Sequence, residues 1–313
     1  MIKVAVASRS FSKHPVLRAE LLNKYPDTTF NDEGLSLSGK ALVDFIDGHE
    51  RVITALEKLD ADFFTALPGL NVISKYGVGY DMIDFGAMAK HGVKLGWTGG
   101  TNRRSVSELM ISTTIALLRH VPAANREVLD GTWHQHMGHY LSGRIVGIVG
   151  CGHIGKDLTP LLNAFDCKVL AHDILDFPDF YAAHNVEPVS LEDLLSRADV
   201  VTLHLPMDDS TKNILSAERL GLMRVDAILV NMARGGLVDE VAMKAMLMDG
   251  RLFGAAFDVF AGEPPEDMEL LRLPNFLATP HIGGSAEEAI LAMGRAAING
   301  LDNARIPDSD WPK

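Results

Sequence analysis

A glycine-rich turn between an apolar strand and a helix is the feature of this sequence with the clearest chemistry. The apolar run at residues 144–149 passes directly into the pattern G-x-G-x-x-G, formed by Gly150, Gly152 and Gly155. In a dinucleotide-binding unit the first glycine permits a tight turn, the second lets the backbone approach a pyrophosphate, and the third lets the helix pack on the strand. The phosphates then lie at a helix N-terminus, which favours an anion. The pattern predicts a dinucleotide site.

An acidic residue after the next apolar run narrows the choice of nucleotide. Asp173 follows the run at residues 169–171, where its carboxylate would accept hydrogen bonds from both adenosine ribose hydroxyls and would repel a 2′-phosphate. The glycine segment also fits G-x-x-x-x-G-K through Lys156, but Asp157 stands where a phosphate-binding loop offers magnesium a neutral hydroxyl. The sequence therefore favours NAD over NADP, and disfavours an ATPase or a glycine turn that binds nothing.

Three residues able to bind an anion or move a proton lie just beyond later predicted strands. Arg234, Glu263 and His281 each follow an apolar run in the second half of the chain. The ligand crevice of a parallel sheet lies outside the carboxyl ends of its strands. Any one of these residues alone is usual for a solvated loop. Behind a nucleotide pattern, the three together indicate a catalytic group.

The elements that must position these residues alternate between short apolar strands and helical patterns. In the first hundred residues the strands are predicted at 4–7, 52–54, 72–74 and 93–97, with helices at 15–25, 61–67 and 82–91. In the second half the strands are predicted at 144–149, 169–172, 200–204, 227–231, 255–259 and 277–279. Helix starts are indicated at Ser190 and Asp239, whose side chains suit an N-cap. Such alternation predicts parallel sheets covered by helices.

Two further helices indicate how the chain passes between domains. A helix at residues 105–120 follows a break at residues 99–102, and the last helix, at 286–304, returns to the first domain. The predicted fold class is therefore α/β, with two doubly wound parallel-sheet domains. One comprises residues 1–100 and 286–313, and the other residues 101–285.

Composition sets outer limits on function. The chain has 313 residues, of which 47% are hydrophobic, enough for two ordinary cores. The formal net charge is −12 and no stripe of Lys or Arg occurs, which disfavours nucleic acid and anionic membranes. The first residues read as a strand rather than a signal peptide, and no apolar run approaches a membrane span, so we expect a cytoplasmic protein. Cys151 and Cys167 are expected to be packing residues.

The sequence resembles the D-isomer-specific 2-hydroxyacid dehydrogenases over nearly its whole length. Besides the glycine pattern and the three candidate residues, the segments 75–81, 102–108 and 204–206 occur in the order and at the spacing of that family. The resemblance implies a Rossmann NAD-binding domain inserted in a flavodoxin-like substrate domain. Segment 102–108 is most similar to phosphoglycerate dehydrogenases. If the chain is of that type and ends at Lys313, we expect it to lack the regulatory domain that some of them carry.

The resemblance implies an NAD-dependent oxidoreductase that transfers a hydride between nicotinamide and a D-2-hydroxy acid/2-oxo acid pair. Arg234 would hydrogen-bond the carboxylate and polarise the carbonyl, because its planar fork of donors matches both. His281 would exchange the proton of the hydroxyl group. Glu263 would hold the other ring nitrogen and stabilise the charged imidazole.

Other positions acquire roles only through the resemblance. For the substrate, these are the backbone N–H groups of Val78 and Gly79, and Asn102 near the hinge. For the cofactor, they are His153 and Ile154 at the pyrophosphate, Leu205 and Pro206 at the adenosine, Ala233 at the nicotinamide and Asp258 at its carboxamide.

The substrate and even the activity stay open at this point. Candidate substrates are 3-phosphoglycerate, glyoxylate or hydroxypyruvate, and lactate. Formate dehydrogenases are disfavoured because that branch carries Gln where this chain has Glu263. A phosphite dehydrogenase keeps all three candidate residues and remains an alternative, as does a non-catalytic NAD-sensing protein related to transcriptional corepressors.

Two surface features receive plainer interpretations. The histidines His134, His136 and His139 beside Trp133 lack Cys or carboxylate partners at ligand spacing, so we expect a solvated or interface segment and no metal. Arg103 and Arg104 are expected to face solvent or a partner subunit, the alternative being a substrate phosphate.

A homodimer is implied by the resemblance. It would be built on the nucleotide domain and the helix at 105–120, which carries the apolar residues Leu109, Met110, Ile115, Leu117 and Leu118. Burial of those residues within the domain explains them equally well.

Overall fold

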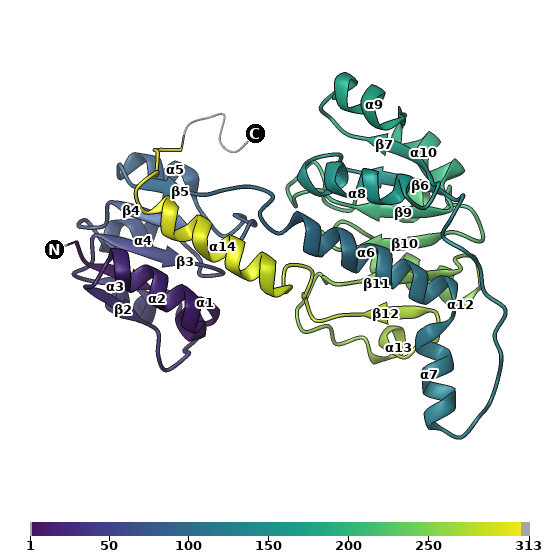
Figure 1. Cartoon of the computed structure of the whole chain (residues 1–313), viewed down its shortest axis with the longest axis horizontal. Coiled ribbons are helices and arrows are strands. Elements are labelled where there is room, and N and C mark those ends of the chain that lie inside the picture. The colour runs from purple at the N-terminus through teal and green to yellow at the C-terminus, as the bar shows by residue number, and fades with distance from the viewer. Residues whose placement is uncertain (1, 308–313) are drawn as a thin grey trace. The chain divides into compact units, whose positions relative to one another are not determined.

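The structure, a computed structural model, describes residues 2–307, which form two compact units (Figure 1). The first unit joins the chain up to Asn102 with the chain from Glu287 onward, and the second comprises Arg103–Ala286. The sequence placed these divisions at residues 100/101 and 285/286. The first unit is therefore discontinuous, and the second is inserted in it.

The sheet of the first unit is parallel throughout. Its five strands are β1 (Val4–Val6), β2 (Thr28–Phe30), β3 (Arg51–Thr54), β4 (Val72–Lys75) and β5 (Lys94–Gly96). Their order β2-β1-β3-β4-β5 is that of flavodoxin-like sheets. The sequence missed β2, because only Phe30 of its three residues is buried and no apolar run marks it.

Helices cover both faces of this sheet, each over its own core. On one face are α1 (Arg9–Lys13), α2 (Pro15–Lys24) and α14 (Glu287–Gly300). On the other are α3 (Gly39–Ile46), α4 (Ala61–Ala66) and α5 (Phe85–Lys90). Helix α3 was missed by the sequence, and α14 ends at Gly300 rather than at residue 304. The returning helix thus completes one face of the first sheet, where Met293 and Ala297 are buried.

The sheet of the second unit has seven parallel strands, not the predicted six. They are β6 (Ile145–Val149), β7 (Lys168–His172), β8 (Val186–Pro188), β9 (Val200–Leu203), β10 (Ile228–Asn231), β11 (Gly254–Phe257) and β12 (Phe276–Ala278). The order β12-β11-β10-β9-β6-β7-β8 contains the dinucleotide-binding order, extended by β12. The missed strand, β8, is a three-residue edge strand that ends in Pro188, a residue confined to such positions.

Both faces of this second sheet are covered as well. One face carries α6 (Arg103–Leu118), α8 (His153–Asn163) and α9 (Pro178–His184). The other carries α10 (Leu191–Arg197), α11 (Ala217–Leu220), α12 (Glu240–Met248) and α13 (Met268–Leu271). The predicted N-caps are confirmed: Ser190 Oγ accepts the N–H of Asp193 at 3.1 Å, and Asp239 Oδ1 that of Ala242 at 2.9 Å.

The long helix α6 belongs to the core of the second unit. It begins at Arg103, two residues earlier than predicted, and Met110, Leu117 and Leu118 are buried against the sheet. Leu109 and Ile115 are partly buried against the same core. Intradomain burial therefore accounts for these apolar residues, and the placement of a dimer interface on this helix stays a prediction.

Exposed apolar side chains lie instead on the next helix, α7 (Val121–Leu129), and the segment that follows it.

No helix within residues 2–307 has both the length and the apolar character needed to cross a membrane. Cys151 and Cys167 are free and buried, as expected of packing residues. Burial raises the pKa of the Cys151 thiol to about 11, so the thiol stays protonated near neutral pH.

Candidate active site

The glycine turn after β6 has the geometry that a dinucleotide needs. Gly150 has a φ of 95°, and a Cβ there would lie 2.7 Å from the carbonyl oxygen of His204. A Cβ on Gly155 would lie 2.7 Å from the carbonyl oxygen of Gly150, so α8 packs directly on the turn. A Cβ on Gly152 would meet no protein atom within 4 Å. The first and third glycines are required by internal packing, whereas the second leaves open the side on which a pyrophosphate would approach.

The start of α8 and the end of β7 supply complementary polar groups around this turn. Gly152 is the N-cap of α8 and offers no side chain to the first-turn N–H groups of His153 and Ile154. Asp173 directly follows β7, and its Oδ2 accepts the N–H of Cys151 at 2.6 Å. Its Oδ1 accepts the N–H of Leu175 at 2.8 Å. Each carboxylate oxygen retains a lone pair, so the group can still accept hydrogen bonds from hydroxyls such as those of a ribose.

The neighbouring strand β9 brings a second segment to the same turn. A Cβ on Gly150 would lie 2.9 Å from Cδ2 of Leu205, and Pro206 accepts a 2.8 Å hydrogen bond from Thr211 Oγ1. Burial lowers the pKa of His204 to about 3, so its imidazole stays neutral. The ring contacts Thr202 Oγ1 through Nε2 at 3.0 Å, and its buried Nδ1 has no partner among the described residues.

A histidine and a glutamate from two loops at the carboxyl edge of this sheet contact each other. Nδ1 of His281 lies 3.0 Å from Oε2 of Glu263, with side-chain exposures of 50% and 41%. The other oxygen of Glu263 accepts the N–H of Phe260 at 3.2 Å. Because the carboxylate accepts, Nδ1 carries the proton. Nε2 is then the ring nitrogen available to another molecule.

The loop that carries His281 is held by a buried aspartate. Asp258, 1% exposed, directly follows β11. Its Oδ1 accepts hydrogen bonds from Thr279 Oγ1 at 2.5 Å and from the N–H of Ile282 at 2.8 Å, and its Oδ2 accepts the N–H of Gly283 at 2.7 Å. The resemblance assigned Asp258 to the cofactor carboxamide. The structure gives it an anchoring role that the sequence missed, since all three donors lie in another loop.

The loop after β10 places Arg234 beside the loop of Glu263. Asn231 Nδ2 donates to the Arg234 carbonyl at 2.9 Å, and Asn231 Oδ1 accepts the N–H of Ala233 at 3.1 Å. Arg234 Nη1 donates to the Ala233 carbonyl at 2.6 Å. A Cβ on Gly235 would lie 1.9 Å from the Phe260 carbonyl oxygen, so the two loops pack backbone against backbone. These contacts join the three candidate loops of the second unit into one framework.

Two of the candidate substrate residues of the first unit, Val78 and Gly79, lie in the loop after β4. The third, Asn102, is the last residue of the first stretch of chain in this unit. The Val78 carbonyl accepts a 2.9 Å hydrogen bond from Trp97 Nε1, which braces the loop containing Gly79. Asn102 closes the first stretch of this unit, and its buried Oδ1 has no hydrogen-bond partner among residues 2–307. The substrate contacts of all three residues stay predictions.

Arg103 and Arg104 have a partner within the chain. Arg104 Nε lies 3.0 Å from Oδ2 of Asp157, and Arg103 Nε lies 3.6 Å from its Oδ1. Asp157, the residue that argued against a phosphate-binding loop, thus joins α8 to the start of α6. Both side chains stay exposed, at 53% and 54%, as the sequence led us to expect, and the structure adds an ion pair with a carboxylate on α8.

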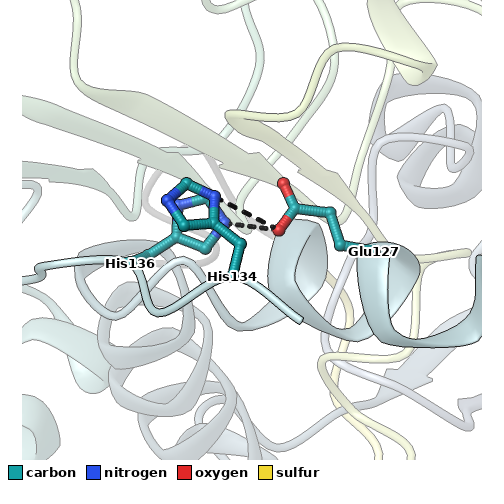
Figure 2. A group of neighbouring side chains, drawn as sticks. All are labelled: Glu127, His134 and His136. Atoms are coloured by element: carbon teal, nitrogen blue, oxygen red, sulfur yellow. Dashed lines mark hydrogen bonds and ion pairs between the residues drawn. The ribbon is translucent and has the colours of Figure 1, made fainter. Parts of the chain in front are cut away.

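The sequence analysis expected the histidine segment to have no carboxylate partner. That expectation is wrong, because a glutamate on α7 contacts two of the histidines. Nε2 of His136 lies 2.7 Å from Oε2 of Glu127, and Nδ1 of His134 lies 3.7 Å from the same oxygen (Figure 2). The sequence does show an acidic residue on the preceding helix. The pattern of apolar residues, however, does not reveal that this residue faces the later loop.

Comparison with known proteins identifies the family. The model of the D-isomer specific 2-hydroxyacid dehydrogenase NAD binding domain matches residues 111–283. A hydroxypyruvate reductase from Thermotoga maritima is 35% identical over 252 residues, which cover 78% of this chain and 80% of that protein. A D-3-phosphoglycerate dehydrogenase from Methanocaldococcus jannaschii is 36% identical over 246 residues, covering 78% of this chain but only 47% of that protein. The chain thus spans about half the length of the phosphoglycerate dehydrogenases it matches.

Solved structures agree with this assignment. A putative D-isomer specific 2-hydroxyacid dehydrogenase from Polaromonas sp. superposes with a TM-score of 0.88 at 28% identity, covering 96% of each chain. A D-lactate dehydrogenase from Aquifex aeolicus, solved with NAD and lactic acid, gives a TM-score of 0.85 at 21% identity over 98% of this chain and the whole of the other, and so shows the same fold. The predicted family, fold class and cofactor are confirmed: the chain belongs to the D-isomer-specific 2-hydroxyacid dehydrogenases, a family of NAD-dependent oxidoreductases.

Proposed function

We propose that this chain interconverts a 2-oxo acid and a D-2-hydroxy acid, with His281 as the acid and base. The observation that carries the proposal is the 3.0 Å contact between His281 Nδ1 and Glu263 Oε2 at the carboxyl edge of the dinucleotide-type sheet. A carboxylate on one ring nitrogen fixes the tautomer and orientation of the imidazole, which leaves Nε2 to exchange a proton with substrate.

Each candidate residue then has a defined task. NAD, when bound, supplies or accepts the hydride. The protonated imidazole of His281 donates its Nε2 proton to the carbonyl oxygen during reduction, and the neutral ring takes the hydroxyl proton during oxidation. Arg234 hydrogen-bonds the substrate carboxylate and draws electron density from the carbonyl. The N–H groups of Val78 and Gly79, and the side chain of Asn102, are proposed to bind the rest of the acid.

Hydroxypyruvate or glyoxylate is the substrate that we favour. A hydroxypyruvate reductase is among the relatives of this chain, at 35% identity over 252 residues. Asp157 also partly neutralises Arg103 and Arg104, the extra cations that a substrate phosphate would need. An uncharged substituent on the 2-oxo acid therefore fits the chain better than a phosphate.

A substrate panel tests this assignment. Steady-state kcat/KM would be measured for hydroxypyruvate, glyoxylate, phosphohydroxypyruvate and pyruvate, each with NADH and with NADPH. We expect hydroxypyruvate or glyoxylate to give the largest kcat/KM, with NADH preferred because Asp173 repels a 2′-phosphate. Preference for phosphohydroxypyruvate would overturn the substrate choice.

Two alternatives are separated by the same assay. Oxidation of phosphite with NAD, without turnover of any oxo acid, would identify a phosphite dehydrogenase. Tight binding of NADH without turnover of any of these substrates would favour the non-catalytic NAD-sensing protein. Either result would leave the fold and the cofactor intact and would remove the proposed chemistry.

We also propose a homodimer, with its interface moved from α6 to α7 and the segment after it. Large apolar side chains are exposed there: Val121, Val128, Leu129, Trp133, Met137 and Tyr140. Such a patch on one helix and its following segment is typical of an interaction surface. Sedimentation should give twice the chain mass, and Met137→Glu should shift the protein towards monomer. A monomer at micromolar concentration would contradict the proposal.

A cytoplasmic location stays a prediction, which cell fractionation would test.

A further inference from the structure

Two histidines and a glutamate converge outside the proposed active site. Glu127 is on α7, and His134 and His136 are on the segment after it (Figure 2). One potential ligand atom of each residue lies within 4.8 Å of the other two. The two imidazoles also lie close together, with ring centroids 4.1 Å apart. Three groups with lone pairs therefore face a common point.

The backbone holds this arrangement on both sides of the histidines. The N–H of Thr132 donates to the Glu127 carbonyl at 2.8 Å, which turns the chain back along α7. The N–H of His139 donates to the Leu118 carbonyl at 2.8 Å, which pins the far end of the segment to α6. Since both ends are fixed, bringing these side chains together costs less conformational entropy than it would on a free loop.

The separations suit a tetrahedral ion after a small adjustment. Bonds of about 2.0–2.1 Å to a tetrahedral zinc ion place two ligand atoms about 3.3 Å apart. The two distances from Glu127 Oε2 are 2.7 Å, to His136 Nε2, and 3.7 Å, to His134 Nδ1, and lie on either side of that value. The 2.7 Å contact between Glu127 and His136 is a hydrogen bond, and an ion bound by both groups would take its place.

No basic side chain among the described residues competes for the carboxylate of this group. Among residues 2–307, Glu127 forms ion pairs only with the two histidines, so no Lys or Arg competes for its carboxylate. The ring of His120 lies 5.3 Å from that of His136, centroid to centroid.

We propose that Glu127, His134 and His136 bind a divalent transition-metal ion of the zinc class. Two imidazoles and one carboxylate are a ligand set that suits zinc, with water in the fourth position. Magnesium and calcium prefer sets of oxygen ligands and are expected to bind far more weakly. The ion would tie the segment after α7 to that helix.

The proposed metal site is separate from hydride transfer. The rings of His120 and His139 both contact that of Phe253, with centroid distances of 5.2 Å and 5.5 Å in tilted and edge-on arrangements. Phe253 immediately precedes β11. Asp258 and the candidate catalytic loops follow the other end of that strand. Four residues of strand span about 13 Å, so the metal site lies at the opposite edge of the sheet from the proposed chemistry.

Calorimetric titration of zinc tests the proposal. Full-length protein without an affinity tag would first be treated with a chelator, and then titrated with zinc chloride and, separately, magnesium chloride. We expect one high-affinity zinc site per chain, and no comparable heat with magnesium. His134→Ala, His136→Ala and Glu127→Gln should each weaken zinc binding at least tenfold, because each removes a ligand.

A matched control and a stability measurement keep this test decisive. His139→Ala removes a histidine from the same segment that is outside the proposed ligand set, and should bind zinc like the unaltered protein. Zinc should also raise the Tm of the unaltered protein and of His139→Ala, and leave the Tm of the three ligand variants nearly unchanged. Absence of stoichiometric zinc binding, or equal binding by a His134→Ala/His136→Ala double variant, would overturn the proposal.

Discussion

Two glutamate–histidine contacts in the second unit use the same functional groups and differ in what surrounds them. In the first, a single imidazole meets Glu263, and the loop of that imidazole is anchored by buried Asp258. In the second, Glu127 meets two imidazoles on a segment pinned by the backbone. One imidazole with one free ring nitrogen suits proton transfer, whereas two imidazoles around one carboxylate suit a cation. The number and support of the ligands, not their identity, separate the two expected functions.

A fourth histidine completes the comparison, because its ring has no carboxylate partner among residues 2–307. His204 is partly buried, and desolvation of its ring lowers its pKa to about 3. It therefore stays neutral over the range in which a histidine usually titrates. The structure thus offers three environments for one residue type, and each can be tested separately.

The largest effect is expected from the first contact. His281→Asn should lower kcat about 10²–10⁴-fold, the usual contribution of a general acid and base. Asn is chosen because it tolerates the left-handed φ of 54° that His281 adopts. Stopped-flow kinetics would measure the chemical step, and NADH fluorescence titration should show nearly unchanged cofactor binding. His139→Asn, at an exposed histidine, should retain activity. Loss of NADH binding instead would show that His281 serves the cofactor.

The partner carboxylate is expected to contribute less. Glu263→Gln keeps an acceptor for the imidazole but removes the charge, so kcat should fall about 10–100-fold, as for other residues that orient a functional histidine. Glu266→Gln, on the same loop, is the matched control. If the two variants gave equal kcat, the contact seen in the structure would have no part in the reaction.

Removing the anchor should affect both stability and rate. Asp258→Asn places an amide where a carboxylate accepts three hydrogen bonds, so the free energy of unfolding should fall by about 2 kcal/mol. Urea unfolding would measure the loss, with Asp209→Asn at an exposed aspartate as control. Because the loop of His281 loses its support, kcat should also fall while the KM for NADH changes little. A variant as stable as the control would contradict the anchoring role.

The smallest effect concerns the pH dependence of stability. The unfolded chain binds a proton at His204 near pH 6.5, whereas the native pKa is about 3, so stability is lost as the pH falls below about 6.5. For this one residue the loss between pH 7 and pH 6 is about 0.7 kcal/mol. His204→Gln should flatten the dependence by that amount in urea titrations at the two pH values. An unchanged slope would mean that the native protein can protonate His204.

How far the sequence alone predicted the fold varies with the kind of element. The buried strands β6, β9 and β10 were found because a continuous apolar run marks a strand covered on both faces. Strands β2 and β8 were missed because they are short, lie at sheet edges and contain few buried side chains. A local pattern therefore identifies buried central strands most readily, although the edge strand β12 was also found.

The candidate site divides in the same way. The glycine turn and Asp173 are readable locally, because each residue acts through its own backbone or directly follows a strand. The anchoring by Asp258, the backbone contact between Gly235 and Phe260, and the approach of Glu127 to two histidines were not predicted. Each of these depends on how two loops, or a helix and a loop, pack in space.

The sequence by itself therefore determined the family, the parallel-sheet architecture and NAD as the cofactor, because apolar runs and a glycine turn express their chemistry over a few consecutive residues. Only the tertiary structure decided which loop holds His281, and that a carboxylate meets the histidine segment. Contacts between segments distant in sequence depend on the packing of several elements at once, and no local pattern specifies them.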